Sequence, residues 1–373
     1  MKRMFMGRAF PVLIEPLFQV WQFYTVPAAI LPCPAPCQAA RGSLSVCGLG
    51  DNTSTGSTMN DANTPVVPGG KHWILLGTRS IITITGGDAR DFLQGLISSD
   101  AHRISPTQAI YGALLTPQGK FLHEFFLVER DGLLLLDCEI ARKDDLLRRL
   151  TMYKLRADVD LVDAAETYRV FALLGDHGFG YKIGEAQELD GGVAFVDPRL
   201  AGLGARAILP ETEAENVLTA AGYTEADFNA YDRHRLSLGV PDGSRDLTVD
   251  KSVLMESNFD ELHGVDFEKG CYVGQEVTTR TKRRGLVKKR LLPVDVSGPL
   301  PAPGTPVLLG DRDAGVMCSG LDGRGLALLK LEKVEQSQHS STALRSSEAE
   351  LKVVIPNWLT LAGSDQNSDT GSS

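Results

Sequence analysis

The sequence predicts an α+β fold followed by a small, separate β-barrel or sandwich. Of its 373 residues, 43% are hydrophobic and 23% are charged, a globular composition sufficient for two or three domains. Between residues 73 and 290, strand-like and helix-like segments are mixed without the regular alternation of a doubly wound parallel sheet. After residue 290, short apolar runs are separated by Gly, Pro and Asp, which is typical of a small all-β domain.

The first part of this region predicts a meander of antiparallel strands with two helices. Residues 80–85 alternate isoleucine with threonine, the pattern of a half-buried strand. Asp88 is expected to cap the short helix that follows it, and residues 141–150 have the apolar spacing of a second helix. Turns with the sequences T-P-Q-G and E-R-D-G separate three of the strands. The predicted strands are residues 74–76, 80–85, 111–115, 121–128, 133–137 and 157–162.

A second group of elements follows, and then the all-β region. Strands are expected over residues 168–174, near Val193 and over 205–209, with a helix over 211–221. No helix is predicted in the last region before its end. Its predicted strands are residues 291–296, 305–309, 314–319 and 326–330.

The two ends of the chain show no hydrophobic period. Residues 42–70 are rich in Gly, Ser, Thr, Asn and Asp, so we expect a disordered extension, with Met59 as an alternative start. Basic residues at positions 2, 3 and 8 before an apolar run also allow a transit peptide. The predicted domains are an extension over 1–70, a core over 71–288 with two subdomains divided near 165, a barrel over 289–358 and a disordered tail over 359–373.

Charge and cysteine usage restrict the function classes. The net charge of −9 makes the surface as a whole repel nucleic acid and anionic lipid. The apolar run over 10–31 is interrupted by charged and polar residues, so no membrane span is predicted. Six scattered cysteines do not form a disulfide scaffold or a metal-ligand pattern, so no stably bound metal is expected. We expect a monomeric protein of the cytoplasm, or of the mitochondrial matrix if the extension is a transit peptide.

The most unusual segment is V-D-F-E-K-G-C-Y-V-G-Q-E-V, over residues 265–277. Gly270 and Gly274 suit a turn in which the backbone approaches another group closely. Cys271 follows Lys269 by two positions, and a nearby positive charge lowers the pKa of a thiol and makes it reactive. The alternative is a loop cysteine without chemistry.

The octapeptide K-G-C-Y-V-G-Q-E within this segment resembles the signature of the YgfZ family, folate-binding relatives of the glycine-cleavage aminomethyltransferase (GcvT). The resemblance implies an aminomethyltransferase-like fold, in which ferredoxin-like subdomains surround a central hole that binds tetrahydrofolate or a one-carbon derivative. Cys271 would be the redox or cluster-related thiol, on a loop formed by Lys269, Gly270, Tyr272, Gly274, Gln275 and Glu276. Further matches, in order, are F-L-Q-G-L-I-S-S-D at 92–100, P-Q-G-K at 117–120, Y-K-L-R-A-D-V at 153–159, D-P-R-L-A-G-L-G-A-R at 197–206 and R-L-S-L-G-V-P at 235–241.

A folate site of this kind requires particular groups. A carboxylate accepts the adjacent N–H donors of a pterin, an aromatic wall holds the aminobenzoate ring, and a cation attracts the glutamate tail. Glu256 is the predicted carboxylate and Arg235 the predicted cation. Tyr272 and Phe259 are the predicted walls.

The resemblance implies two alternative functions. The first is a tetrahydrofolate-binding accessory protein in iron–sulfur cluster assembly or repair, with iron–sulfur client or assembly proteins as partners and tRNA-modifying enzymes among the clients. The second is a tetrahydrofolate-dependent aminomethyl transferase or demethylase. The aminomethyltransferases carry an acidic pair in G-G-x-x-D-D, and the equivalent run here is G-K-F-L-H-E. His123 and Glu124 are therefore the possible bases for such an enzyme.

A basic run follows the motif. Such a run could bind RNA, the polyglutamate tail of a folate or an acidic partner protein. The alternative is a solvated strand edge whose charges prevent aggregation. Seven of the eleven residues at 280–290 are basic, namely Arg280, Lys282, Arg283, Arg284, Lys288, Lys289 and Arg290.

Overall fold

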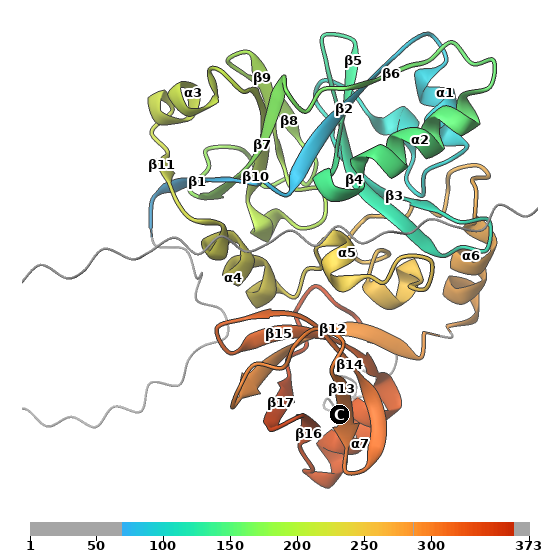
Figure 1. The fold of residues 1–373 in the computed structure, drawn as a ribbon, viewed down its shortest axis with the longest axis vertical. Helices are drawn as coiled ribbons and strands as arrows, with labels where there is room; N and C mark the ends of the chain where they lie inside the picture. The colour runs from blue at the N-terminus through green and yellow to red at the C-terminus, as the bar shows by residue number, and fades with distance from the viewer. Residues whose placement is uncertain (1–68, 286, 362–373) are drawn as a thin grey trace, which may run out of the picture. The chain divides into compact units, whose positions relative to one another are not determined.

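A computed structural model of the chain describes residues 69–285 and 287–361 (Figure 1). The predictions for the extension up to residue 68 and for the tail beyond residue 361 lie outside these described residues. Two sheets with their helices precede a closed barrel, in agreement with the predicted α+β class. Within the described residues, no helix has the length and apolar character needed to cross a membrane.

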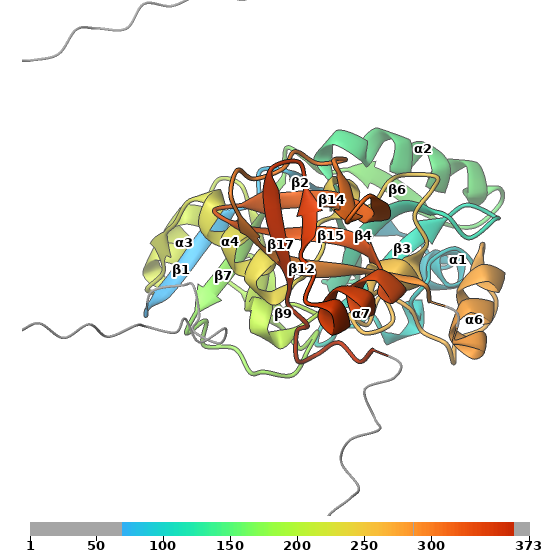
Figure 2. The same cartoon turned by 90° about the horizontal axis from the view of Figure 1, so that it is seen from below.

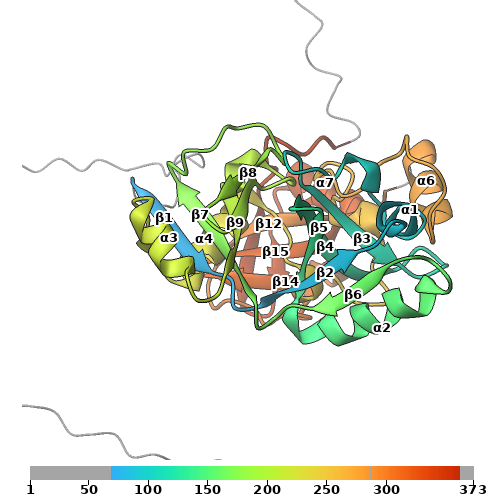
Figure 3. The same cartoon turned by 90° about the horizontal axis from the view of Figure 1, so that it is seen from above.

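The first sheet has five antiparallel strands in the order β3-β4-β5-β2-β6. They are β2 (Arg79–Thr85), β3 (Ile110–Leu115), β4 (Phe121–Arg130), β5 (Leu133–Glu139) and β6 (Asp160–Asp163). Two helices, α1 (Ala89–Gln94) and α2 (Lys143–Lys154), pack apolar residues that include Leu93 and Leu146 into this sheet's core (Figure 3). Asp88 occupies the predicted cap position of α1, but its carboxylate accepts a bond from the backbone N of Asp158 (2.8 Å) and does not cap the helix.

The second sheet has six strands in the order β11-β1-β7-β10-β9-β8. They are β1 (Lys71–Leu75), β7 (Tyr168–Gly175), β8 (Ala186–Leu189), β9 (Gly192–Val196), β10 (Ala205–Pro210) and β11 (Thr224–Glu225), and α3 (Ala214–Ala220) packs into their core. Strand β1 pairs antiparallel with β7, so the predicted division near residue 165 does not hold for it. The reason is burial, because Ile74 and Trp73 point to opposite faces of this sheet and pack into two apolar cores that both contain residues of β7.

The two sheets share an apolar core. Ile81 and Phe126 of the first sheet pack with Val170 and Phe195 of the second. The rings of Phe126 and Phe195 have centroids 6.5 Å apart. Three guanidinium groups also approach the Phe126 ring, at 3.8, 4.9 and 5.4 Å from its centroid.

These guanidinium groups belong to a buried ionic network between the sheets. Asp137 of β5 accepts bonds from Arg79 Nε (2.6 Å) and Arg206 Nη1 (2.9 Å). Asp197 accepts bonds from Arg206 Nε (3.1 Å) and Arg199 Nη2 (2.8 Å). All five side chains are at most 3% exposed, so each charge depends on its neighbours for compensation. The conspicuous D-P-R-L-A-G-L-G-A-R run thus contributes charges that join the two sheets.

The C-terminal domain is a closed barrel in the order β12-β15-β14-β13-β16-β17. Its elements are β12 (Lys289–Ser297), β13 (Pro306–Leu309), β14 (Arg312–Leu321), β15 (Arg324–Lys330), α7 (Leu331–Ser340), β16 (Leu344–Ser346) and β17 (Ala349–Val353). Four of its strands were predicted, whereas α7, β16 and β17 were not. Leu359 is buried in the barrel core, so the ordered domain extends past the predicted boundary at 358.

Helices α4 (Phe228–Leu238) and α5 (Gly243–Asp246) lie between the sheets and the barrel (Figure 1). Seen from below, the barrel strands lie in front of the two sheets (Figure 2). Arg235 of α4 is completely buried at this junction. Its guanidinium donates to Asp232 Oδ1 (2.6 Å), Asp246 Oδ2 (3.0 Å) and Ser319 Oγ (2.8 Å) of β14. Arg235 therefore joins the barrel to the core, and this burial leaves it no surface for the predicted contact with a folate tail. Helix α6 (Gln275–Arg284) and four short 3₁₀ helices, at Ala101–Arg103, Ile140–Arg142, Ala201–Leu203 and Leu254–Ser257, complete the described structure.

We predict that Arg235→Leu destabilises the protein by about 3–5 kcal/mol, because it leaves the Asp246 carboxylate buried without its cation. Arg233→Leu on the same helix is the matched control, since Arg233 and Asp322 form a largely exposed pair worth at most about 1 kcal/mol. Urea unfolding of both variants measures the difference. Equal destabilisation by the two substitutions would contradict the assignment.

Candidate functional site

The K-G-C-Y-V-G-Q-E loop is anchored to another of the sequence motifs. Lys269 Nζ donates to the backbone oxygens of Ile97 and Ser99, both at 2.7 Å. The backbone N of Val273 donates to Gly95 O (3.1 Å). Both contacts reach the segment 92–100, so two motifs far apart in sequence meet here. Burial lowers the pKa of Lys269 to about 8, while Asp100 and Asp266 oppose that shift.

A third motif touches the same loop through two glycines. Gly119 of the P-Q-G-K turn and Gly274 have φ angles of +72° and +84°, a conformation that favours glycine. A Cβ atom added to Gly274 would lie 2.4 Å from Thr116 O and 3.2 Å from Gly119 Cα. The close approach expected from the sequence is therefore an approach to the P-Q-G-K turn.

We predict that Gly274→Ala destabilises the protein by about 1–3 kcal/mol, because alanine is strained at this φ and its Cβ meets the Thr116 carbonyl. Gly270→Ala is the matched control in the same loop, since nothing lies within 4 Å of its added Cβ. Its effect should stay within about 0.5 kcal/mol. Thermal and urea unfolding of the two variants test this, and a neutral Gly274→Ala would refute the close packing.

Cys271 is exposed on this anchored loop. The following residue, Tyr272, is buried, and its backbone N donates to Gln275 Oε1 (3.0 Å) at the start of helix α6 (Gln275–Arg284). The other cysteines of the described chain, Cys138 and Cys318, are buried, and burial raises the pKa of each thiol to about 12. Among the described residues, the accessible thiol is therefore the one in the predicted motif.

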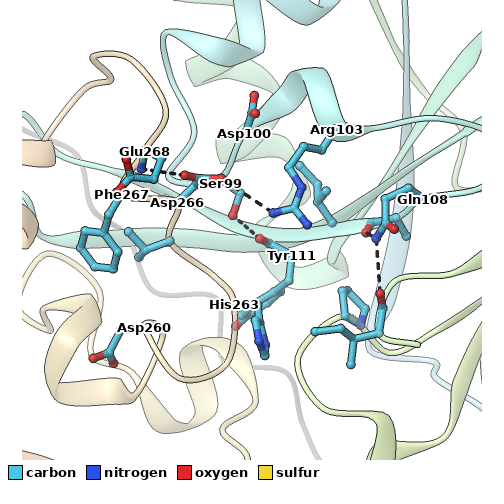
Figure 4. Close-up of a pocket in the computed structure, with 15 residues that line it drawn as sticks. Ser99, Asp100, Arg103, Gln108, Tyr111, Asp260, His263, Asp266, Phe267 and Glu268 are labelled. Carbon is cyan, nitrogen blue, oxygen red and sulfur yellow. Dashed lines mark hydrogen bonds and ion pairs between the residues drawn. The ribbon is translucent and has the colours of Figure 1, made fainter. Parts of the chain in front are cut away.

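A pocket of about 340 Å³ lies beside the loop (Figure 4). It is lined by three segments, 99–111 from the first sheet's region, Ile183 and Pro198 from the second, and 260–268 leading into the motif. Its polar lining includes four carboxylates, from Asp100, Asp260, Asp266 and Glu268. The other polar lining residues are Ser99, Arg103, Gln108, Tyr111 and His263.

Two of these four carboxylates are already compensated. Asp266 accepts bonds from the backbone N of Glu268 (2.8 Å) and of Lys269 (3.1 Å), and Arg103 lies 3.7 Å from it. Asp260 pairs with Arg290 (2.8 Å). Asp100 Oδ1 accepts a bond from the backbone N of His102 (3.1 Å), and neither Asp100 nor Glu268 forms an ion pair with another described residue. Their remaining acceptor oxygens are available to a ligand that carries N–H donors.

The predicted cofactor-binding residues do not line this pocket. Phe259 stacks on Tyr111, with ring centroids 5.0 Å apart, and so lies behind a lining residue. Tyr272 is buried beneath Lys269, whose Nζ is 5.1 Å from its ring centroid. Glu256 is partly buried, and burial raises its pKa, while the positive charges of Lys289 and Lys120 lower it. Arg235, the fourth predicted cofactor-binding residue, is buried between α4 and the barrel.

The two possible bases lie on opposite faces of β4, as consecutive strand residues must. His123 contacts Asp145 of α2, with Nε2 and Oδ2 3.0 Å apart, and burial lowers its pKa to about 4. Glu124 accepts a bond from Arg79 in the core between the sheets, and burial raises its pKa despite that bond. The two residues are not brought together at one site, and neither lines the pocket.

The basic run divides into buried and exposed charges. Its first part belongs to α6, so the expected strand edge is wrong for these residues. Arg290 is buried and paired with Asp260, whereas Arg280, Arg283 and Lys288 are exposed. Lys282 lies 3.6 Å from Asp260 and its Nζ is 5.4 Å from the Phe267 ring centroid, at the margin of the pocket. Lys289 is half-buried at the start of the barrel.

Sequence reasoning missed the pocket carboxylates and the buried network. Asp100 ends the F-L-Q-G-L-I-S-S-D motif, whose polar end after an apolar helix face was a usable signal. Asp137 and Arg206 are charged residues inside otherwise apolar strands, which indicates a buried partner.

Comparisons with known proteins agree with this architecture. Residues 288–361 match the family model of the CAF17 C-terminal β-barrel domain. The chain is 33% identical over 304 residues to the human mitochondrial iron–sulfur cluster assembly factor IBA57, across 76% of this chain and 84% of the human protein. It is 30% identical to the mouse protein of that name, with the same coverage, and 30% identical to the homologue from Coccidioides immitis, across 73% of this chain and 74% of that protein.

A solved structure is similar in fold. It is the glycine cleavage system aminomethyltransferase T from Bartonella henselae, with a TM-score of 0.64 and 14% sequence identity. The similarity covers 79% of this chain and 88% of the other. The predicted aminomethyltransferase-like fold with a C-terminal barrel is confirmed.

Proposed function

The chain belongs to the IBA57 family of iron–sulfur cluster assembly factors, and on this premise we propose that it acts in iron–sulfur cluster assembly through Cys271. The observation that carries the proposal is an exposed thiol on a loop held by Lys269 and Gly274. The cluster is the cargo of this reaction. Client enzymes would include those that modify tRNA.

A cysteine thiolate in this position can bind iron at the edge of a cluster, attack a persulfide or form a mixed disulfide. Iron ligation is favoured, because Cys138 and Cys318, the other cysteines of the described residues, are buried and cannot act as resolving thiols without unfolding. The remaining cluster ligands would come from the protein that delivers or receives the cluster.

The test removes the native protein from its own cells and restores the full chain. Activities of several iron–sulfur enzymes should fall on removal and recover on restoration, while an enzyme without a cluster stays unchanged as the control. Unchanged iron–sulfur enzyme activities after removal would reject the proposal.

We also propose a mitochondrial location, since the relatives are named as mitochondrial proteins. The cytoplasmic prediction has no support from these relatives, whereas the mitochondrial alternative does. Cell fractionation of the full chain and of a version starting at Met59 tests this. The proposal requires the full chain in the matrix fraction and loss of that fraction for the shortened version.

Tetrahydrofolate binding is a second candidate function, because the pocket has a volume typical of small-molecule sites. Asp100 and Glu268 suit the adjacent N–H donors of a pterin, and Tyr111 supplies an aromatic side chain. Bound there, tetrahydrofolate would supply a carrier of one-carbon groups. The accessory function is favoured over aminomethyl transfer, since His123 and Glu124 lie elsewhere.

Calorimetric titration with tetrahydrofolate tests this second function. Asp100→Asn should weaken binding about tenfold, while Asp131→Asn, an exposed residue outside the pocket, should not. Absence of binding at millimolar ligand would exclude the pocket as a folate site.

A further inference from the structure

The turn that ends helix α2 exposes a leucine in a strained conformation. Leu155 is 88% exposed, and its φ and ψ angles are +47° and −104°. A positive φ is an outlier for a bulky residue, whereas a glycine or an asparagine ends a helix without this strain. A leucine at this position strains the backbone and buries little apolar surface, so the fold alone does not explain it.

Hydrogen bonds hold this turn against the segment before α1. The backbone N of Gly87 donates to Asp158 Oδ2 (2.9 Å), and the backbone N of Asp158 donates to Asp88 Oδ2 (2.8 Å). These reciprocal bonds fix the chain three residues beyond Leu155. The strained leucine is therefore presented to solvent by an ordered turn.

Two more apolar side chains are exposed beside Leu155. Met152 and Tyr153, in the last turn of α2, are 65% and 41% exposed. Met152 lies three residues before Leu155, a spacing that makes residues neighbours on a helix surface. Single exposed apolar residues are ordinary, but three within residues 152–155 form one patch.

Basic residues flank the apolar patch. Residues 148–156 have the sequence R-R-L-T-M-Y-K-L-R, which contains four basic residues and no acidic one. Arg148 Nη1 lies 3.4 Å from Met152 Sδ, so a cation borders the patch directly. Arg156 is exposed and forms no ion pair with another described residue. The segment therefore combines exposed apolar side chains with positive charge.

The carboxylates near this segment are already engaged. Asp145 accepts bonds from both Arg148 and Arg149, so one negative charge serves two arginines. Asp160 pairs with Lys154 (3.3 Å). The net charge of −9 belongs to the chain as a whole, and exposed charges more than about 8 Å away are largely screened at physiological ionic strength. The local charge therefore decides what this patch attracts.

We propose that residues 148–156, the end of α2 and the turn after it, bind the surface of a membrane that contains anionic lipids. Leu155 and Met152 enter the boundary between headgroups and acyl chains, and Tyr153 occupies the interface, where tyrosine is enriched. The arginine and lysine side chains around them contact the headgroup phosphates. Apolar side chains that project between cations from an ordered turn fit a lipid surface, whereas a protein partner would need a matching groove.

This surface is separate from the motif loop. Figures 2 and 3 both show α2 and α6, the helix that follows the Cys271 loop, on opposite edges of the described chain. Membrane contact through α2 therefore leaves the Cys271 loop accessible. The inference does not depend on the chemistry of the thiol.

Binding to vesicles tests the proposal. The full chain is sedimented with vesicles of phosphatidylcholine alone and with vesicles that also contain about 30% phosphatidylglycerol. Leu155→Asp changes the apolar tip, and its matched control is Tyr181→Asp, at an exposed aromatic residue elsewhere. Arg156→Gln removes a charge from the surface. Its control is Arg312→Gln, since Arg312 is also exposed and forms no ion pair with another described residue.

The wild-type chain should bind the anionic vesicles about tenfold or more above the neutral ones. Leu155→Asp should weaken this binding about tenfold or more, because burial of the leucine is lost. Arg156→Gln should weaken it about fivefold, and both controls should match the wild type. Segments common to all these proteins contribute equally, so the differences report on the turn. Urea unfolding should show no loss of stability in Leu155→Asp, since aspartate tolerates a positive φ better than leucine.

Three results would overturn the membrane proposal. The first is absence of binding of the wild-type chain to the anionic vesicles, and the second is equal binding by Leu155→Asp and Tyr181→Asp. The third comes from a photoreactive diazirine amino acid placed at position 155 in cells, if it joins to a protein and not to lipid. None of these results affects the proposed function, which fails only if the wild-type chain does not restore iron–sulfur enzyme activities.

Discussion

Cys271→Ser should abolish the support of iron–sulfur enzymes while leaving the fold unchanged. A serine hydroxyl is not ionised at neutral pH and is a poor ligand for iron, so the cluster-handling step is lost. Because Cys271 is exposed, the substitution should change the free energy of unfolding by less than about 0.5 kcal/mol. The measurements are enzyme activities in cells lacking the native protein, together with urea unfolding of the purified chain.

Cys318→Ser is the control for this prediction. Cys318 is buried between the barrel and α4, so a hydroxyl there should destabilise the protein by about 1–3 kcal/mol. It should nevertheless restore enzyme activity when the chain is present at the wild-type level. Full restoration by Cys271→Ser would remove the thiol from the mechanism and leave the pocket as the functional feature.

Asp137→Asn should cost about 3–5 kcal/mol, because it leaves the positive charges of Arg79 and Arg206 buried with one carboxylate fewer. Asp160→Asn is the matched control. Asp160 lies on an edge strand of the same sheet and pairs with Lys154 at the surface, where a pair contributes at most about 1 kcal/mol. Urea unfolding of both variants gives the comparison.

The same network predicts a dependence on pH. Burial alone would raise the pKa of Asp197, but Arg199 and Arg206 overcome it and hold the pKa at about 2. An aspartate in the unfolded chain has a pKa of about 3.9. The stabilisation from Asp197 is therefore complete above about pH 4 and is lost as the pH falls towards 2. A free energy of unfolding that stays constant over this range would contradict the ionic network.

The local elements of the fold were predictable from the sequence. Alternation of isoleucine and threonine identified β2, and turn residues separated the strands of the meander. These signals depend on a few neighbouring residues, so they can be recognised without knowledge of the fold. Strands β16 and β17 of the barrel were missed although their residues alternate between buried and exposed, because they have only three and five residues.

The candidate site was predictable as a motif but not as a set of contacts. Of the two glycines expected to approach another group closely, Gly274 does so, whereas nothing lies within 4 Å of a Cβ added to Gly270. Gly274 packs against the segment 116–119, and Lys269 donates to the segment 97–99. Such pairings join residues more than 150 positions apart and are set by packing of whole elements.

By itself, the sequence determined the α+β class, the C-terminal barrel and the motif loop that carries Cys271. The tertiary structure alone decided the environment of each charge. Arg235 became the link to the barrel, His123 and Glu124 were placed on opposite faces of β4, and the basic run was divided between Asp260 and solvent. The physical reason is that secondary structure follows from local side-chain patterns, whereas burial and ion pairing depend on which distant elements pack together.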